Sequence, residues 1–293
     1  MKKILFLFLA TILLQSCNDG DIIVTTFNFD DAELVDCGVA GNYVFYKVNS
    51  DALESLSLKL TVTDSLYKTE GIKTYTLNGT TNFVNYRTYD GELGSSYFCS
   101  SIPPTSPNVT VDYLAASGTA VFTTTFFIED NDGVPQEYEL AGDSDGDGLD
   151  NIYDFDDDGD NVLTALELDL EADDDDPTTD PLDTDGDGIM DYLDNDDDND
   201  TVLTRYEDDG DLNPRNNVTN SSIGPDYLNP AVANTYLENR SLLHTYKIYK
   251  TVQITLKNLV LVRGDEEIII ETLDLGTIEN VEVITKTFTP PVL

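Results

Sequence analysis

The chain carries DSDGDGLDNIYDFDDDGDNVLTALE at residues 143–167 and repeats it 40 residues later as DTDGDGIMDYLDNDDDNDTVLTRYE at residues 183–207. The two copies agree almost position by position in their acids, glycines and apolar residues. A run of like charges alone is typical of a disordered tail or a solvated surface. The regular spacing of these acids and the apolar residues between them instead favour a fold organised by bound cations.

Each copy contains two loops with the spacing of a calcium ligand set. A twelve-residue loop supplies oxygens from positions 1, 3, 5, 7, 9 and 12, with glycine at position 6 for a sharp turn. We name the loops A (143–154), B (156–167), C (183–194) and D (196–207). The predicted ligands, with a backbone carbonyl at position 7, are Asp143, Asp145, Asp147, Leu149, Asn151 and Asp154 in loop A; Asp156, Asp158, Asp160, Val162, Thr164 and Glu167 in loop B; Asp183, Asp185, Asp187, Ile189, Asp191 and Asp194 in loop C; and Asp196, Asp198, Asp200, Val202, Thr204 and Glu207 in loop D.

Position 6 distinguishes loops B and D from loops A and C. Loops A and C have glycine there, whereas loop B has Asn161 and loop D has Thr201. Asparagine tolerates the left-handed backbone region, but a β-branched threonine does so poorly. We therefore expect loop D to be the weakest or most distorted of about four Ca²⁺ sites.

Two further stretches resemble parts of the motif. Asp130-Asn131-Asp132-Gly133 is a shorter copy, for which a turn is the favoured interpretation. Residues 224–229 repeat the middle of the second copy, but Asn220, Ser221 and Ser222 replace its leading acids, so no strong ion site is expected there.

The D-x-D-x-D-G spacing of residues 143–207 resembles thrombospondin type 3 repeats and the calcium-binding Asp-rich repeats of Bacteroidota surface proteins. Only one residue separates the loops within a copy, which leaves no room for the helices of an EF-hand. The resemblance implies that aspartates wrap a line of ions around little hydrophobic core. The cysteines of the animal repeats are absent from this stretch.

The charge distribution excludes one class of partner. The net charge is −42, and residues 143–211 hold 30 of the 57 acids but, in Arg205, only one of the 15 bases. Phosphate binding needs clustered lysine and arginine, so nucleic acid is not an expected partner. We also find no nucleophile elbow, phosphate loop or zinc spacing, and the single histidine, His244, lies in a strand pattern. A non-enzymatic protein is therefore expected.

The N-terminus has the pattern of an export signal. Lys2 and Lys3 precede the apolar run Ile4–Leu14, which is too short to span a bilayer as a helix. The sequence then reads Leu-Gln-Ser-Cys and resembles a bacterial lipobox, which implies removal of residues 1–16 and lipid attachment at Cys17. The acidic stretch after Cys17 resembles the surface-export signal of Bacteroidota lipoproteins. An outer-membrane lipoprotein is expected, at the cell surface or, alternatively, on the periplasmic leaflet.

The two other cysteines, Cys37 and Cys99, predict one disulfide, because an exported chain occupies an oxidising compartment. Two free buried cysteines are the alternative.

The remaining sequence reads as β structure. Aromatic and β-branched residues alternate, and strands are predicted at 43–48, 55–63, 72–77, 81–88, 119–128, 244–262, 267–275 and 281–288. We expect a mainly β chain with a β-sandwich-like domain and an inserted or interposed calcium module. The predicted division is signal peptide 1–16, tether 17–36, β domain 37–140, Asp-rich repeats 141–230 and C-terminal strands 231–293. Those last strands either complete the first sheet or pack on the repeats.

These features predict a calcium-binding, lipid-anchored envelope protein with a structural, adhesion or binding role toward a protein or glycan ligand. The alternatives are a glycan-binding accessory protein of a nutrient-uptake system and a hydrolase whose site has no recognisable motif.

Overall fold

A computed structural model describes residues 28–63, 65–100, 102, 104–139, 141–168, 179 and 181–291. The predicted signal peptide 1–16 and the lipidation site Cys17 lie outside the described residues. The described chain is mainly β, as the alternation predicts, and its only helices are short 3₁₀ turns. Among the described residues, no helix has the length and apolar character needed to cross a membrane.

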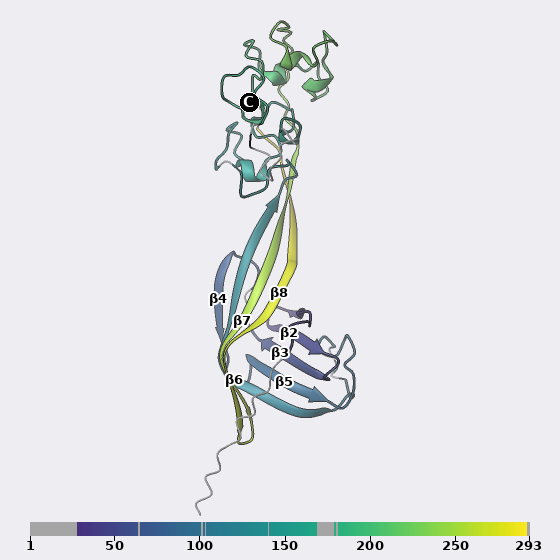
Figure 1. Cartoon of the computed structure of the whole chain (residues 1–293), viewed down its shortest axis with the longest axis vertical. Coiled ribbons are helices and arrows are strands. Elements are labelled where there is room, and N and C mark those ends of the chain that lie inside the picture. Colours follow the sequence, from purple (N-terminus) through teal and green to yellow (C-terminus); the bar gives the residue numbers. More distant parts are fainter. Residues whose placement is uncertain are drawn as a thin grey trace, which may run out of the picture. The chain divides into compact units, whose positions relative to one another are not determined.

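The described residues form eight strands, and Figure 1 labels β2 to β8. The strands are β1 Val35–Val39, β2 Asn42–Asn49, β3 Glu54–Leu60, β4 Gly71–Thr76, β5 Phe83–Tyr89, β6 Val109–Glu129, β7 His244–Arg263 and β8 Glu266–Phe288. Three differences from the predicted strands stand out. β1 begins inside the predicted tether, β6 begins ten residues early, and the last two predicted strands are one continuous β8.

The strands form one sheet instead of the expected two-sheet sandwich. Their order is β1-β2-β3-β5-β6-β7-β8, with β4 paired to β6. The pairs from β1 to β6 are antiparallel, with Tyr43 opposite Leu60 and Val84 opposite Ala115. β7 and β8 therefore extend the sheet begun by the N-terminal strands, which is one of the two arrangements that the sequence left open.

The chain divides into two compact units, and the division crosses β6, β7 and β8. Unit 1 comprises the described residues within Met1–Leu66, Ile72–Phe122 and Ile254–Gly276. Unit 2 comprises Tyr67–Gly71, Thr123–Gln253 and the described part of Thr277–Leu293. All of the Asp-rich loops belong to unit 2.

The sheet in unit 1 curls, and this curl replaces the second layer of a sandwich. The rings of Phe45 in β2 and Phe122 in β6 lie 5.3 Å apart. These strands are three places apart in the sheet, so a flat sheet would separate them by about 14 Å. The curl encloses a core of fully buried side chains, among them Phe45, Leu56, Leu58, Phe122, Leu256, Leu261 and Leu275.

A local bend in β7 accompanies the curl. Val252, Ile254 and Leu256 are buried alternately, and then the buried positions shift by one to Leu259 and Leu261. Asn258, at the shift, has a positive φ of 53°. Gly118 of β6 faces this bend, and a side chain there would lie 2.8 Å from the carbonyl oxygen of Lys257. A residue without Cβ is therefore required at position 118.

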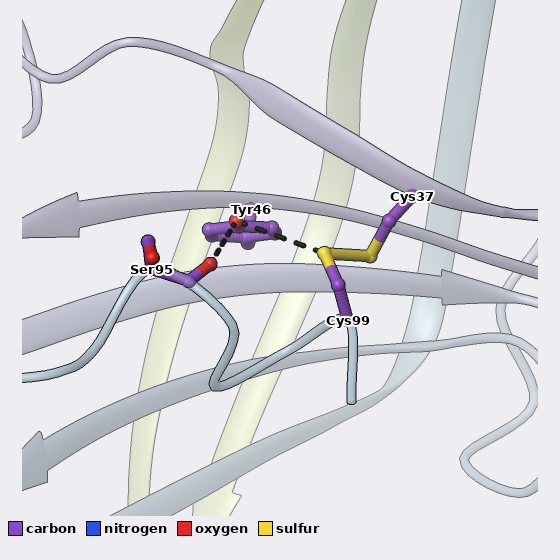
Figure 2. Close-up of a disulfide and its surroundings, with 4 residues drawn as sticks. All are labelled: Cys37, Tyr46, Ser95 and Cys99. Atoms are coloured by element: carbon purple, nitrogen blue, oxygen red, sulfur yellow. Dashed lines mark hydrogen bonds between the residues drawn. A yellow bond between two sulfur atoms is a disulfide. The ribbon is translucent and has the colours of Figure 1, made fainter. Parts of the chain in front are cut away.

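The predicted disulfide is confirmed. Cys37 of β1 and Cys99 of the β5–β6 connection are bonded, with 5.7 Å between their Cα atoms (Figure 2). Tyr46 lies beside the bond and stacks on Phe98, and its hydroxyl donates to the carbonyl of Ser95 at 3.4 Å. A link between residues this far apart in sequence stabilises by about 4 kcal/mol in the chain-entropy model.

Candidate metal centre

The four loops fold by the same hydrogen bonds between aspartate and backbone. In loop B, Oδ1 of Asp158 accepts the backbone N–H of Asp160 at 3.2 Å, and Oδ1 of Asp160 accepts that of Val162 at 2.6 Å. The carboxylate at position 3 thus fixes the backbone at position 5, and the carboxylate at position 5 fixes the backbone at position 7. The same pairs recur as Asp145–Asp147–Leu149 in loop A, Asp185–Asp187–Ile189 in loop C and Asp198–Asp200–Val202 in loop D.

The carboxylate at position 1 accepts a hydrogen bond from the backbone of the turn. Asp143, Asp156 and Asp196 accept the backbone N–H of position 6, at 3.0 Å in loop A and 3.2 Å in loops B and D. In loop C the carboxylate of Asp183 accepts the N–H of Gly186 at 2.8 Å. Four separate segments therefore adopt the conformation that the calcium-loop spacing predicts.

Each aspartate at positions 3 and 5 uses one oxygen for the backbone, which leaves the second oxygen for another partner. Among the described residues, buried oxygens without a hydrogen-bond partner include Oδ2 of Asp147, Asp158, Asp160, Asp198 and Asp200. Both carboxylate oxygens of Glu167 and of Glu207 are likewise buried and without a hydrogen-bond partner among the described residues. Buried acceptors are almost always satisfied in folded proteins. So many orphaned oxygens in one segment point to a cation as the missing partner.

Loop B forms the most enclosed group. Asp158, Asp160 and Glu167 bring one oxygen each within 4.8 Å of one another, and Asp197 of loop D adds a fourth. The exposed fraction of each of these four residues is 6% or less. The sequence did not assign Asp197 as a ligand, because it occupies position 2 of its own loop. The two copies are thus joined through one acidic cluster.

Loops A and C bring their first three acids together. Asp143, Asp145 and Asp147 form one group within 4.8 Å, and Asp183, Asp185 and Asp187 form another. Apart from Asp147, which is 5% exposed, these residues are more exposed than the loop B group. The twelfth residues link the loops of each copy, because Asp154 and Asp194 accept the N–H groups of Asp156 and Asp196 at 3.0 and 3.1 Å.

The predicted ligands at position 9 have a different contact. Asn151 accepts the backbone N–H of Ser144 at 3.0 Å, and both oxygens of Asp191 accept from Thr184 at 2.7 Å. The hydroxyls of Thr164 and Thr204 accept the N–H groups of Asp157 and Asp197 at 3.1 and 3.3 Å. In each loop, the side chain at position 9 is thus hydrogen-bonded to the backbone N–H at position 2. Metal coordination by them stays a prediction.

His244 lies at loop A. It is 1% exposed, and its Nδ1 contacts Oδ1 of Asp154. Its ring stacks on Phe155 at a centroid distance of 4.5 Å. Burial lowers the pKa of His244, but the hydrogen bond to Asp154 and the neighbouring aspartates outweigh it, so the pKa is raised. With Asp147 and Asp154 it forms a buried group that can hold a metal ion, which the strand pattern did not predict.

Arg205, the only base of residues 143–211, is a structural link. Its guanidinium is 5% exposed and donates to the carbonyl oxygens of Gly159 and Arg240, both at 3.1 Å, and to the hydroxyl of Ser241 at 3.2 Å. It ties the second copy to the first and to the chain that leads into β7. The planar fork of arginine suits such divergent acceptors.

The carboxylates are in an environment that disfavours their ionised form. Burial raises the pKa of Glu167 and Asp158 well above the usual range, and the negative charges of neighbouring acids add to this. Burial and neighbouring acids also raise the pKa of Glu207 to about 8. Either protons or a cation must compensate such a cluster. Hard oxygen donors with a terminal bidentate glutamate suit Ca²⁺.

The backbone at position 6 has a positive φ in all four loops. The φ angle is 99° at Gly148, 74° at Asn161, 96° at Gly188 and 81° at Thr201. Thr201 therefore holds a β-branched side chain in the left-handed region, which costs about 1–2 kcal/mol.

Sequence reasoning missed Asp157 and Asp197, although a signal was present. Loops B and D both have aspartate at position 2, whereas loops A and C have Ser144 and Thr184 there. An acid that no ligand scheme uses, yet present in both copies, indicated a contact outside its own loop.

We predict different pH dependences for the calcium-free and the calcium-loaded protein. The folded-state pKa of Glu207 is about 8 instead of 4.5. The calcium-free native state thus binds more protons than the unfolded state, and its stability should fall as the pH rises from about 5 to 8. With saturating Ca²⁺ the carboxylate is ionised in the bound native state and, above its unfolded pKa of 4.5, in the unfolded state as well, so stability should change little over the same interval. Thermal unfolding at both pH values measures this. Equal stability of the calcium-free protein at pH 5 and pH 8 contradicts the prediction.

Replacing Thr201 with glycine should strengthen loop D. Relief of the left-handed strain, less the greater chain entropy of glycine, should gain about 1 kcal/mol, which is roughly a five-fold tighter calcium affinity for that loop. Calorimetric titration measures the change. Asn161→Gly in loop B is the matched control and should gain less, because asparagine tolerates this conformation. Equal gains in the two variants argue against strain at Thr201.

Comparisons with known proteins place this chain in no group. No family model, no curated protein and no solved structure matches it. The resemblance of the loops to thrombospondin type 3 repeats therefore stays a prediction. What the chain does has to be inferred from its own loops, sheet and disulfide.

Proposed function

We propose that this chain is a calcium-binding, lipid-anchored protein of the cell envelope, in which about four Ca²⁺ ions fold the Asp-rich segment into a structural module. The module supports a β domain with a structural, adhesion or binding role. The chemistry is non-enzymatic, because the acids serve as ligands and not as catalysts.

One observation carries the calcium proposal. Glu167 and Glu207 end their loops with both carboxylate oxygens buried and, among the described residues, without a hydrogen-bond partner. Position 12 of a calcium loop is where a bidentate glutamate binds the ion. Each glutamate also lies beside acids whose second oxygens are buried and unpartnered, Asp158 and Asp160 for Glu167, Asp198 and Asp200 for Glu207. Two copies share this arrangement, which favours a selected ligand set over chance acidity.

The envelope location is supported by two independent features. The disulfide Cys37–Cys99 is typical of proteins outside the reducing cytosol. The basic, apolar and Leu-Gln-Ser-Cys pattern before Asn18 is typical of lipoprotein export, with Cys17 as the anchor. Outside the cell, calcium is abundant enough for loops of ordinary affinity. Cell-surface exposure is the favoured location, and the periplasmic leaflet is the alternative.

Removing calcium should expose the Asp-rich segment selectively. In EDTA, repulsion among the acids should expand residues 143–211, so a protease should cut there while the curled sheet of unit 1 stays intact. Limited proteolysis with mass mapping of the fragments measures this.

A double variant reproduces the same effect without a chelator. Glu167→Gln with Glu207→Gln should make the segment protease-sensitive in calcium. Asp150→Asn removes an exposed acid of loop A and should leave resistance unchanged. Equal resistance of residues 143–211 with and without EDTA would refute the structural role of calcium.

A second function, glycan binding, is favoured by one cavity in unit 1. Its volume is about 320 Å³, and it is lined by three aromatic side chains, Phe83, Tyr97 and Phe98, together with Lys59, Asn85 and Arg87. Aromatic faces with hydrogen-bonding groups around them are suited to a sugar ring. Such a site fits an accessory protein of a nutrient-uptake system.

A glycan panel tests this second function. If the cavity binds glycans, Tyr97→Ala should weaken binding at least about five-fold through lost stacking, as aromatic contacts contribute about 1–3 kcal/mol. Tyr236→Ala, at a half-exposed tyrosine of unit 2, is the control and should have no effect. A wild-type chain that binds nothing on the panel removes this alternative.

A further inference from the structure

The segment just before the first copy has the register of a fifth loop. From Ile128 to Glu139 it reads IEDNDGVPQEYE. Aspartates stand at positions 3 and 5 (Asp130 and Asp132), glycine at position 6, and glutamate at position 12 (Glu139). Position 1 differs, because Ile128 stands where the other loops have aspartate.

This segment also folds like the other loops. Oδ1 of Asp130 accepts the N–H of Asp132 at 3.3 Å, and Oδ1 of Asp132 accepts that of Val134 at 2.8 Å. Gly133 has a φ of 94°, close to the 99° of Gly148 in loop A. The turn expected from the sequence is therefore the central part of a complete loop.

The acids of this segment converge. Asp130, Asp132 and Glu139 offer oxygens within 4.8 Å of one another. Asp130 is 6% exposed and Asp132 is 1% exposed, and Oδ2 of each has no hydrogen-bond partner among the described residues. The same residues line a cavity of about 300 Å³ with Phe127, Val134 and Ile152.

An acid from another loop supplies an independent observation. Asp157, at position 2 of loop B, is 2% exposed, and its Oδ1 has no hydrogen-bond partner among the described residues. The acids whose charges act on it are Asp132, Glu139, Asp154 and Asp130, so its carboxylate lies in the neighbourhood of this group. Its counterpart Asp197, 40 residues on, belongs to the loop B cluster, where its oxygen is within 4.8 Å of the others.

We propose that Asp130, Asp132 and Glu139, completed by Asp157 from loop B, form a fifth divalent-cation site of the calcium type. Asp157 replaces the position 1 ligand that Ile128 lacks. The donors are all oxygens, as a hard cation requires. A cation there would tie the end of β6 (Val109–Glu129) to loop B, just as the cluster with Asp197 ties loop B to loop D. The proposal rests on the calcium binding proposed above and adds a site outside the two copies.

Calcium counting on the full chain tests the fifth site. Equilibrium dialysis followed by metal analysis should give five bound Ca²⁺ for the wild type and four for Asp132→Asn. That substitution removes the charge but retains Oδ1 as the acceptor that holds the turn. Asp150→Asn, an exposed acid of loop A, should still bind five.

A rescue experiment separates metal binding from a purely structural role. Asp157→Asn should lose one ion, and adding Ile128→Asp should restore it by supplying the usual position 1 ligand. Restored binding is not expected if Asp157 matters only for packing.

The outcomes distinguish this proposal from the proposed function. A wild type that binds four ions, an unchanged count in Asp132→Asn, or no rescue by Ile128→Asp overturns the fifth site but leaves the calcium module standing. A wild type that binds no calcium overturns both.

Discussion

The constraint on which unit 2 depends is the burial of carboxylates that repel one another. Loops B and D fix one oxygen of each aspartate at positions 1, 3 and 5 on a backbone N–H group and leave the other oxygen buried. Apolar burial is limited beside this. One buried hydrophobic cluster of this region is Val134, Leu168 and Tyr192, with Met190 and Leu193 partly buried against it. At about 1.5–3 kcal/mol for each fully buried side chain, this cluster cannot offset tens of ordered residues. Protons or bound cations must therefore compensate the carboxylates, and with cations, as we propose, binding energy is folding energy.

Unit 1 is stabilised by different forces. Its curled sheet encloses fully buried side chains such as Phe45, Leu58 and Leu256, and the disulfide Cys37–Cys99 closes a loop of 62 residues. Neither depends on charge. The long strands β6, β7 and β8 run through both units, so the carboxylate-rich and the apolar parts share a continuous backbone. This combination suits a protein that works outside the cell, where both calcium and oxidising conditions persist.

Much of the fold and of the loop structure was predictable from the sequence. The predictions that were wrong or missing have physical causes. The period-two alternation predicted most strands, since strands such as β6 and β7 alternate between buried and more exposed positions, and the twelve-residue spacing predicted loops A to D. The single sheet was not predictable, because its curl depends on contacts such as Phe45 with Phe122 and on the bend at Gly118 and Asn258. The sequence did not predict a role for Asp157, Asp197 and His244 in the acidic clusters. The residues near them lie on other segments, which spacing within one loop cannot reveal.

The positions of two acids relate the loops to one another. Asp157 lies near the group before its own loop, and Asp197 belongs to that of loop B. The next residue in this series, matched through the shared Asp-Tyr-Leu of 191–193 and 226–228, is Val232, which has no carboxylate. Loop D instead receives a hydrogen bond from the backbone of Asn229 to Asp198. A neutral donor therefore stands beside loop D where an acid stands beside loop B. The segment around residues 224–229 lacks the leading acids of the two copies, and it shares with them the turn in which Thr219 donates to Asp226, as Thr184 does to Asp191.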